Sequence, residues 1–252
     1  LLYLFENGSI KRIDRSFPHR NQYGAYFFSH KDNLYLIGGY GFWQTKSIIT
    51  KFNFNSGDWE IVNAFGQSPE GIDQGTFFIK DDNLYVFDFL TRVSNNQKEK
   101  RNDNLYVLDL ENFVWKKLGV INPLIRSENQ FKGAKRFFVY DDKLLFSYVD
   151  DPEFYLADFE NNSLKKFKDE VLFYKSGGYS VIKKNNLIGA IQNSLTGDIS
   201  VESFNISSLI LNGKSGELYL YRDTEEFYRY VYFAFSFLLI LIIVLMIYHK
   251  TV

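Results

Sequence analysis

The stretch DNLYLIGGYG at residues 32–41 decides the fold. It is followed by a second apolar run at 48–54, a Ser-Gly-Asp turn at 56–58 and the segment WEIV at 59–62. Beta-branched and aromatic residues bounded by Gly, Asn, Asp and Ser are typical of strands joined by turns. The stretch therefore predicts a small antiparallel sheet.

This unit recurs along the chain. LENFVWKKL at 110–118 matches FENNSLKKF at 159–167 position by position, and FENGSIKRI at 5–13 matches both. The position of the unit's tryptophan recurs at intervals of 45 to 56 residues, at Ile10, Trp59, Trp115, Leu164 and Leu209. Such a period fits one four-stranded blade of a β-propeller.

The first unit resembles the kelch repeat, the family that includes the central domain of galactose oxidase. The resemblance rests on Gly38-Gly39 after an apolar strand and on Trp59, 20 residues after the second glycine. It implies an all-β, kelch-like propeller over residues 1–222, with structural roles for Gly38, Gly39, Trp59 and Trp115.

The later units depart from the kelch pattern. The second has Asp88-Phe89 in place of the glycine pair, and the third has Ser147-Tyr148 there and Leu164 in place of the tryptophan.

Four full blades are expected, preceded by two strands of an incomplete blade within 1–14 and followed by one strand at 217–221. The predicted strands are 23–28, 34–39, 48–54 and 59–62; 75–79, 84–89, 104–110 and 114–118; 134–140, 144–148, 154–159 and 163–167; and 178–182, 187–191, 199–204 and 208–211. Unpaired end blades would expose strand edges. Either the two pieces form a composite fifth blade, or the ring has six or seven blades and its start is missing; we favour the missing start.

The chemistry of the chain changes after the propeller. Residues 230–248 form a run of 19 uncharged, mostly apolar residues with tyrosines at its ends. As a helix the run would be about 28 Å long, close to the bilayer core of about 30 Å. It predicts a single-pass transmembrane helix after a juxtamembrane linker at 223–229, followed by a tail at 249–252 that is either short or truncated.

Composition excludes several classes of function. A net charge of −1 argues against a nucleic-acid surface. The absence of cysteine excludes disulfides, thiolate metal sites and a copper-radical oxidase of the galactose oxidase type. The three histidines, His19, His30 and His249, are too scattered to predict a metal site. No catalytic motif and no cofactor motif is present, so we expect no enzyme, metal or cofactor.

The best candidate for a binding site is the loop YGFWQ at 40–44. In kelch-like propellers the loop between the second and third strands projects from one face. Here it carries Tyr40, Phe42 and Trp43, and large aromatics on such a loop mark recognition of a protein or a glycan. The alternative is that Trp43 folds back and caps its own blade.

These observations predict a membrane-anchored, non-catalytic recognition propeller, which we expect to be the extracytoplasmic sensor or receptor part of a single-pass protein. Two alternatives stay open. One is a tail-anchored cytosolic scaffold, which the weak excess of Lys and Arg on the propeller side favours. The other is a carbohydrate-acting enzyme such as a sialic-acid mutarotase, a chemistry found on kelch-like propellers.

Overall fold

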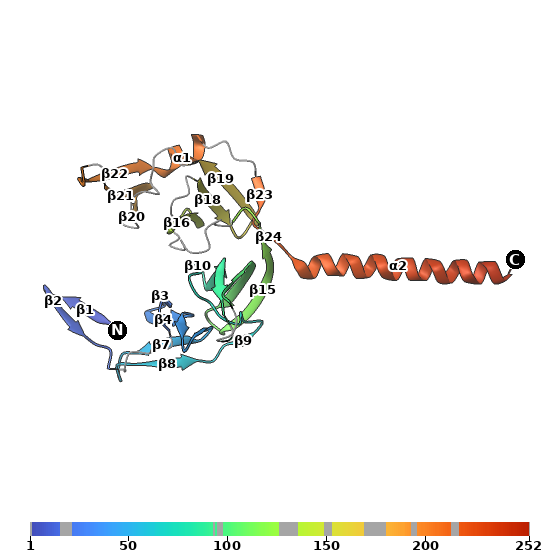
Figure 1. The fold of residues 1–252 in the computed structure, drawn as a ribbon, viewed down its shortest axis with the longest axis horizontal. Helices are drawn as coiled ribbons and strands as arrows, with labels where there is room; N and C mark the ends of the chain where they lie inside the picture. The colour runs from blue at the N-terminus through green and yellow to red at the C-terminus, as the bar shows by residue number, and fades with distance from the viewer. Residues whose placement is uncertain are drawn as a thin grey trace.

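The computed structural model describes residues 2–15, 22–92, 94, 98–125, 136–148, 153–168, 180–192, 196–212 and 217–251. In these residues the four larger sheets follow one another along the chain, and their antiparallel strands form the four blades of an all-β propeller arrangement. Figure 1 shows the blades following one another along an arc, and a long helix leaving the arc on the side away from the N-terminal hairpin. The predicted four-blade propeller is therefore confirmed.

Blade 1 has the predicted strands in chain order. They are β3 (Tyr26–His30), β4 (Asn33–Ile37), β7 (Ile49–Asn53) and β8 (Asp58–Val62). Its innermost strand begins later than predicted, because Tyr23 forms an isolated bridge with Tyr40 instead of joining the sheet.

Blades 2 and 3 also have four strands each in chain order. Blade 2 consists of β10 (Thr76–Lys80), β11 (Asn83–Phe87), β14 (Asn104–Asp109) and β15 (Val114–Ile121). Blade 3 consists of β16 (Arg136–Tyr140), β17 (Lys143–Ser147), β18 (Glu153–Asp158) and β19 (Ser163–Lys168). A short β9 (Phe65–Gly66) runs parallel to β15.

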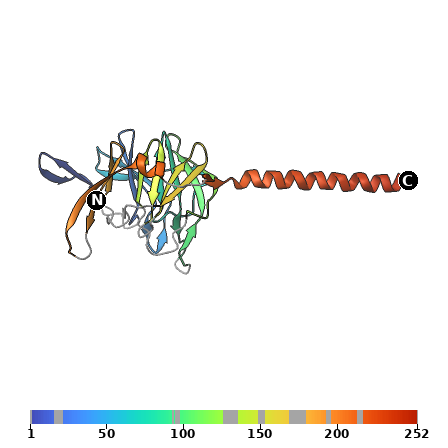
Figure 2. The same ribbon diagram turned by 90° about the horizontal axis from the view of Figure 1, so that it is seen from above.

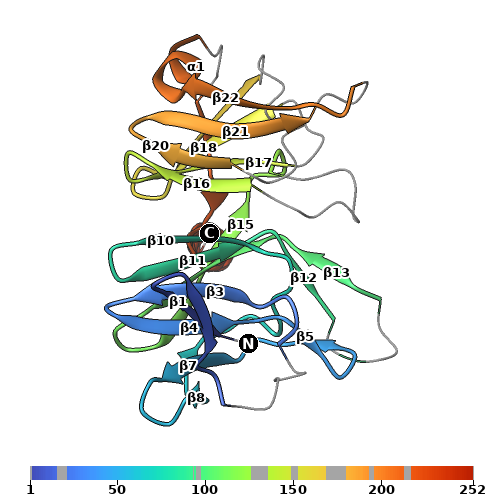
Figure 3. The same cartoon turned by 90° about the vertical axis from the view of Figure 1, so that its left-hand side faces the viewer.

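Loop hairpins project from blades 1 and 2. Blade 1 carries β5 (Tyr40–Gly41) paired with β6 (Gln44–Thr45), and blade 2 carries β12 (Phe89–Thr91) paired with β13 (Lys100–Asn102). The segment between the second and third strands of blade 2 is thus partly a hairpin stem. Figure 3 shows β5 and the β12–β13 hairpin projecting on the same side of the blades.

In blade 4, one of the predicted strands is a helix instead. It contains β20 (Ser180–Lys183), β21 (Asn186–Gln192) and β22 (Ile199–Asn205), but the segment expected as its fourth strand, 208–211, belongs to helix α1 (Ile206–Asn212). The physical reason is a helix cap, since the side-chain oxygen of Asn205 accepts a hydrogen bond of 3.2 Å from the backbone N–H of Ser208. Ile206 at the start of α1 is fully buried.

The extra strand predicted at 217–221 is present as two short strands within Glu217–Arg222, a segment that we call the return strap. Instead of belonging to a further blade, its β23 (Glu217–Tyr219) pairs with β19 of blade 3 and its β24 (Tyr221–Arg222) pairs with β15 of blade 2. Between the two strands, the backbone N–H of Leu220 donates to the carbonyl oxygen of Asn162 and its own carbonyl oxygen accepts from the N–H of Asn122. The strap therefore joins the outer edges of two neighbouring blades.

The structure departs from the prediction at the C-terminal helix, α2 (Thr224–Thr251). Helical structure begins at Thr224, inside the segment expected as a linker, so a single residue, Asp223, separates α2 from β24. Figures 1 and 2 show α2 extending away from the blades. Among the residues that the structure describes, no helix is long and apolar enough to cross a membrane, so the transmembrane helix predicted at 230–248 is not confirmed.

An N-terminal hairpin, β1 (Tyr3–Glu6) and β2 (Ser9–Arg12), stands apart from the blades. In the described part of the chain these two strands pair only with each other, and all of their side chains are exposed. The backbone N–H of Arg15 donates to the carbonyl oxygen of Gly57, which ties the base of the hairpin to the outer turn of blade 1.

The core lies between blades. Each of its three clusters of buried side chains joins a pair of successive blades. On the innermost strand of blade 2, Phe77 packs toward blade 1 and Phe78 packs toward blade 3, as alternation along a strand requires. Phe78 stacks on Phe159 of blade 3 with ring centroids 5.0 Å apart.

The residues of the kelch pattern lie in tight surroundings in blades 1 and 2. Gly38 and Gly39 have φ angles of +74° and +91°, and a Cβ on Gly38 would lie 2.6 Å from the carbonyl oxygen of Ile72. Trp59 lies against Phe52, with ring centroids 5.2 Å apart, and Trp115 is buried.

The attachment of the strap predicts the effect of an alanine at Gly119. A Cβ there would collide with the carbonyl oxygen of Arg222, whereas Gly197 has positive φ and open space around it. Gly119→Ala should lower the free energy of unfolding by about 2 kcal/mol or more, and Gly197→Ala by about 1 kcal/mol, because only the first adds a backbone clash to backbone strain. Urea unfolding measures both, and equal losses would show that the strap is not held closely against blade 2.

Candidate functional site

The predicted aromatic loop is a tight hairpin with two bulky residues at its tip. β5 and β6 are joined by Phe42 and Trp43, whose φ angles are +51° and +60°. Positive φ at both central residues is the signature of a type I′ turn, which strongly favours Asn-Gly. Aromatic residues adopt this conformation at a cost of about 1–3 kcal/mol each.

Both tip side chains face solvent. Phe42 and Trp43 are each 63% exposed. The alternative in which Trp43 caps its own blade is therefore not the arrangement in this structure. Strain and apolar exposure coincide at the same two residues, so neither the backbone nor the burial of these rings explains their presence.

Tyr23 adds a further aromatic ring that sequence reasoning missed. Its backbone N–H and carbonyl oxygen exchange hydrogen bonds of 2.9 and 2.8 Å with Tyr40, and its side chain is strongly exposed. We call the segment Tyr40–Thr45 together with Tyr23 the aromatic hairpin. No sequence signal placed Tyr23 here, because it reads as the start of the innermost strand.

The aromatic hairpin is held by blade 2. The backbone N–H of Arg92 donates to Oγ1 of Thr45 at 2.8 Å, and the N–H of Thr45 donates to the carbonyl oxygen of Arg92 at 3.0 Å. The guanidinium of Arg92 also reaches the hydroxyl of Tyr40 at 3.4 Å. Recognition residues on loops depend on such a rigid support.

The aromatic hairpin can therefore act as a prearranged binding element. Large rigid rings contribute much contact area with little loss of side-chain entropy, which is why aromatic residues dominate binding hot spots. The same flat rings can stack on a sugar.

A second cluster occupies the positions where the later units lose the glycine pair. Asp88 of blade 2 and Tyr148 of blade 3 contact each other across the two blades, with the Tyr148 hydroxyl 2.6 Å from Oδ2 of Asp88. Nε of Arg101 lies 2.6 Å from Oδ1 of Asp88, as an ion pair. The two departures from the kelch pattern thus form one interaction.

This second cluster is enclosed. Asp88 is fully buried and Tyr148 nearly so. Burial, and next the charge of Asp88, hold the pKa of the Tyr148 hydroxyl well above its ordinary value. Strongly shifted groups often mark active sites, but atoms that solvent does not reach cannot meet a substrate, so we interpret the cluster as a structural link between blades.

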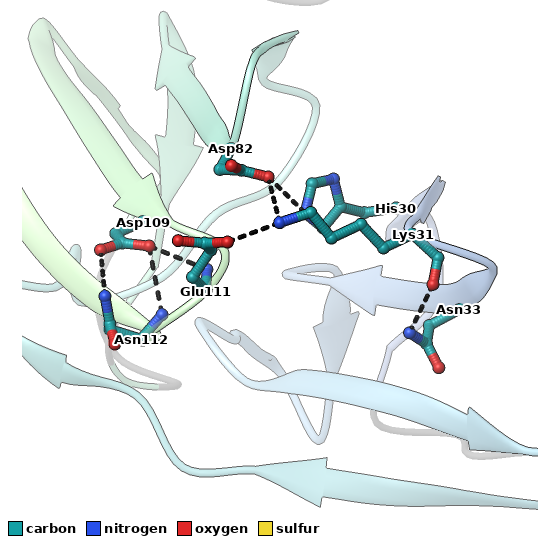
Figure 4. Close-up of polar contacts among 7 residues, drawn as sticks. All are labelled: His30, Lys31, Asn33, Asp82, Asp109, Glu111 and Asn112. Atoms are coloured by element: carbon teal, nitrogen blue, oxygen red, sulfur yellow. Dashed lines mark hydrogen bonds and ion pairs between the residues drawn. The ribbon is translucent and has the colours of Figure 1, made fainter.

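Polar contacts also join blades at the surface. Figure 4 shows Lys31 at the β3–β4 turn of blade 1, whose Nζ lies 2.8 Å from Oδ1 of Asp82 and 2.5 Å from Oε1 of Glu111. His30 Nε2 lies 3.1 Å from the same oxygen of Asp82. Hydrogen bonds to Asp82 and then Glu111 raise the pKa of Lys31 above its usual range.

No group of acidic, histidine or cysteine residues suited to a metal ion occurs in the ranges that the structure describes. Comparisons with protein-family models and with curated proteins find no match to this chain. The kelch resemblance therefore stays a prediction from the repeat, and only the propeller arrangement is shown.

The strain at the tip predicts an unusual response to mutation. Replacing the pair by the favoured turn residues, Phe42→Asn with Trp43→Gly, should raise the free energy of unfolding by about 1–3 kcal/mol because it removes strain and apolar exposure. The matched control is Lys184→Asn with Asn185→Gly in the β20–β21 turn, which also has positive φ at both positions and should gain less. Urea unfolding of both variants measures the gain; a loss in the first would make the aromatic pair a structural element.

The buried tyrosine predicts a loss of stability in alkali. Unfolded Tyr148 ionises near pH 10.0, whereas the folded residue keeps its proton, so the folded state binds more protons and stability falls as pH rises above that value. Tyr148→Phe should lower the free energy of unfolding by about 1.5–3 kcal/mol at neutral pH, because the buried carboxylate of Asp88 loses a hydrogen-bond donor. The free energy of unfolding of this variant should also fall less steeply between pH 10 and 11 than that of the wild type.

The control for that experiment is Tyr140→Phe, which removes a partly buried hydroxyl 2.9 Å from Oγ of Ser207. This control substitution should lower the free energy of unfolding by about 0.5–1.5 kcal/mol, as expected for the loss of a neutral hydrogen bond. If the two phenylalanine variants lost equal stability and had the same alkaline slope, the link between Asp88 and Tyr148 would not support the fold.

Proposed function

We propose that this protein is a membrane-anchored, non-catalytic recognition propeller whose aromatic hairpin binds a protein ligand. The observation that carries the proposal is the pair Phe42 and Trp43, strained in the backbone, exposed in the side chain and held by blade 2. A β-propeller fold suggests an interaction role. A glycan is the other ligand that exposed rings could stack on.

The distribution of polar and apolar groups favours a binding role over a catalytic one. The Tyr148 hydroxyl, whose pKa burial holds well above its ordinary value, lies inside the blades together with Asp88. The groups that the aromatic hairpin itself presents to solvent are aromatic rings, which bind but have no acid or base chemistry near neutral pH.

Membrane anchoring is supported by the side chains of α2. The large apolar side chains that the structure describes on it are exposed around the helix: Tyr228, Tyr230, Val231, Tyr232, Phe233, Phe235, Phe237, Leu238, Leu239, Ile240 and Ile242. A helix that is apolar all round is normally buried in protein or in lipid. The uncharged run at 230–248 fits insertion into a bilayer.

The connection between the blades and α2 is short, which allows ligand binding to affect the helix. With only Asp223 between β24 and α2, and with the return strap bonded to blades 2 and 3, the orientation of the helix is coupled to the blades that support the aromatic hairpin. We propose that the propeller faces outward and that ligand binding is communicated through α2. The repeat is kelch-like in this proposal.

The binding claim is tested with the full chain in detergent micelles. A displayed peptide library and a glycan array are each probed with wild-type protein and with the Phe42→Asn/Trp43→Gly variant, which should be well folded. Peptides that bind the wild type but not the variant are expected. Equal binding by both proteins, or turnover of a bound glycan, would contradict a non-catalytic aromatic binding site.

The membrane claim predicts the outcome of protease protection. Intact cells or spheroplasts expressing the protein with a tag on the propeller are treated with external protease, and the tag is followed by blotting. Cleavage before lysis is expected for an outward-facing domain. Protection until lysis would make the protein a tail-anchored cytosolic scaffold, and recovery of the tag in the soluble fraction would contradict anchoring altogether.

A further inference from the structure

The C-terminal helix leaves the propeller at the outer edge of blade 2. Figure 1 shows α2 starting beside β15 and β24, on the outside of the arc of blades. The backbone accounts for this exit, because β24 pairs with Val120 and Ile121 of β15 and only Asp223 follows before α2. A Cβ on Gly119 would lie 3.1 Å from the Cα of Asp223, so the helix begins directly against β15. We call β15, with β9 and Arg222 beside it, the blade 2 rim.

The helix and the loop hairpins point in different directions. Figure 1 looks onto one face of the arc and shows α2 lengthwise, so the helix runs in the plane of the ring of blades. In Figure 3, where α2 extends away from the viewer, β5 and the β12–β13 hairpin project to one side. If α2 crosses a membrane, the propeller therefore stands on edge, with the blade 2 rim toward the lipid.

The length of the connection places the blade 2 rim at the lipid headgroups. Only residues 224–229 lie between Asp223 and the uncharged run that begins at Tyr230. As a helix this segment rises about 9 Å. The polar layer on each side of the hydrocarbon core is about 5–8 Å thick. When the run is inserted, the rim therefore lies against the headgroup layer.

Basic side chains on the blade 2 rim suit the phosphate groups of lipids. Lys116 and Lys117 lie on β15 and point to opposite faces of the strand, so one is available on each side of the rim. In the part of the chain that the structure describes, neither lysine has an ion pair. The guanidinium of Arg222 lies over the ring of Tyr219, 4.7 Å from its centroid, and Asp223 adds one opposite charge beside it. Arginine and tyrosine are both common at membrane interfaces.

Apolar side chains are exposed on the same rim. Val114 of β15 is 44% exposed, and Phe65, which lies opposite it in the pairing of β9 with β15, is 66% exposed. Segments that lie at a membrane surface combine such groups, because cations reach the phosphates while apolar side chains enter the boundary with the acyl chains. Blade 2 has a neighbouring blade on each side, so this exposure belongs to the rim and not to an open end of the arc.

We propose that the blade 2 rim rests on phospholipid headgroups around the base of α2 and holds the propeller on edge at the membrane. This inference rests on the proposed anchoring by α2. Lys116, Lys117 and Arg222 contact lipid phosphates, and Phe65 and Val114 reach the boundary below them. The aromatic hairpin then faces along the membrane surface, so its protein ligand reaches it from the side.

The absence of cysteine from the chain allows a single label to be placed at will. Lys116→Cys on the rim and Lys100→Cys, an exposed lysine on β13 at the loop face, are each labelled with a fluorophore. The full chain is reconstituted into phospholipid vesicles whose headgroups carry a quencher. Strong quenching at position 116 and weak quenching at position 100 are expected. Equal quenching at the two positions, or stronger quenching at position 100, would overturn the edge-on arrangement.

Flotation of the same vesicles separates this inference from membrane anchoring. Protein that does not float with the vesicles would contradict the anchor, and the contact of the rim with it. Protein that floats but is quenched equally at both positions would contradict the contact of the rim alone.

Charge reversal tests the two lysines directly. Lys116→Glu with Lys117→Glu should weaken the quenching of a label at Val114→Cys while the protein still floats with the vesicles. The matched control, Lys98→Glu with Lys100→Glu, reverses two exposed lysines at the loop face and should leave that quenching unchanged. Urea unfolding shows that both variants are folded. Unchanged quenching in the rim variant, or an equal loss in the control, would show that these lysines do not contact the headgroups.

Discussion

The contact between blades is the constraint on which this structure depends. In the described residues the clusters of buried side chains lie between successive blades, although Phe52 of blade 1 is buried against Trp59 of its own blade. Tyr26 of blade 1 stacks on Phe77 of blade 2 with ring centroids 4.1 Å apart, and Phe78 on the same strand stacks on Phe159 of blade 3. Stability in such a repeat is close to a sum of nearest-neighbour terms. Interior blades therefore gain two interfaces and end blades gain one.

Two further features strengthen this row of interfaces. Where the glycine pair of blade 1 allows close backbone approach, blades 2 and 3 use Asp88 and Tyr148, which bond to each other. On the outer edge, the return strap adds a strand to each of the same two blades and continues into α2. The middle of the arc is thus the best supported part, and it holds both the helix and the base of the aromatic hairpin.

Most of the fold could be predicted from local sequence patterns. The recurring position of the tryptophan predicts the period, and turns such as Asp-Asn-Leu-Tyr at 32–35 and 82–85, which join the inner strands of blades 1 and 2, support it. A strand at 217–221 was predicted, but its pairing was not, because its partners on β15 and β19 lie far back in the sequence. Helix α1 was missed because Asn205 reads equally well as a turn residue and as a helix cap. The aromatic loop was found from composition, but its positive φ angles could not be, since Phe and Trp do not favour that conformation.

A double-mutant cycle between blades 2 and 3 tests most directly whether blades depend on their neighbours. Phe78→Ala and Phe159→Ala are made singly and together, and the free energy of unfolding is measured for each protein. Because these rings stack across the interface, we predict that the losses are not additive, with a coupling of about 0.5–1.5 kcal/mol. Additive losses would mean that each blade is stable on its own contacts, and would contradict the dependence of the propeller on packing between blades.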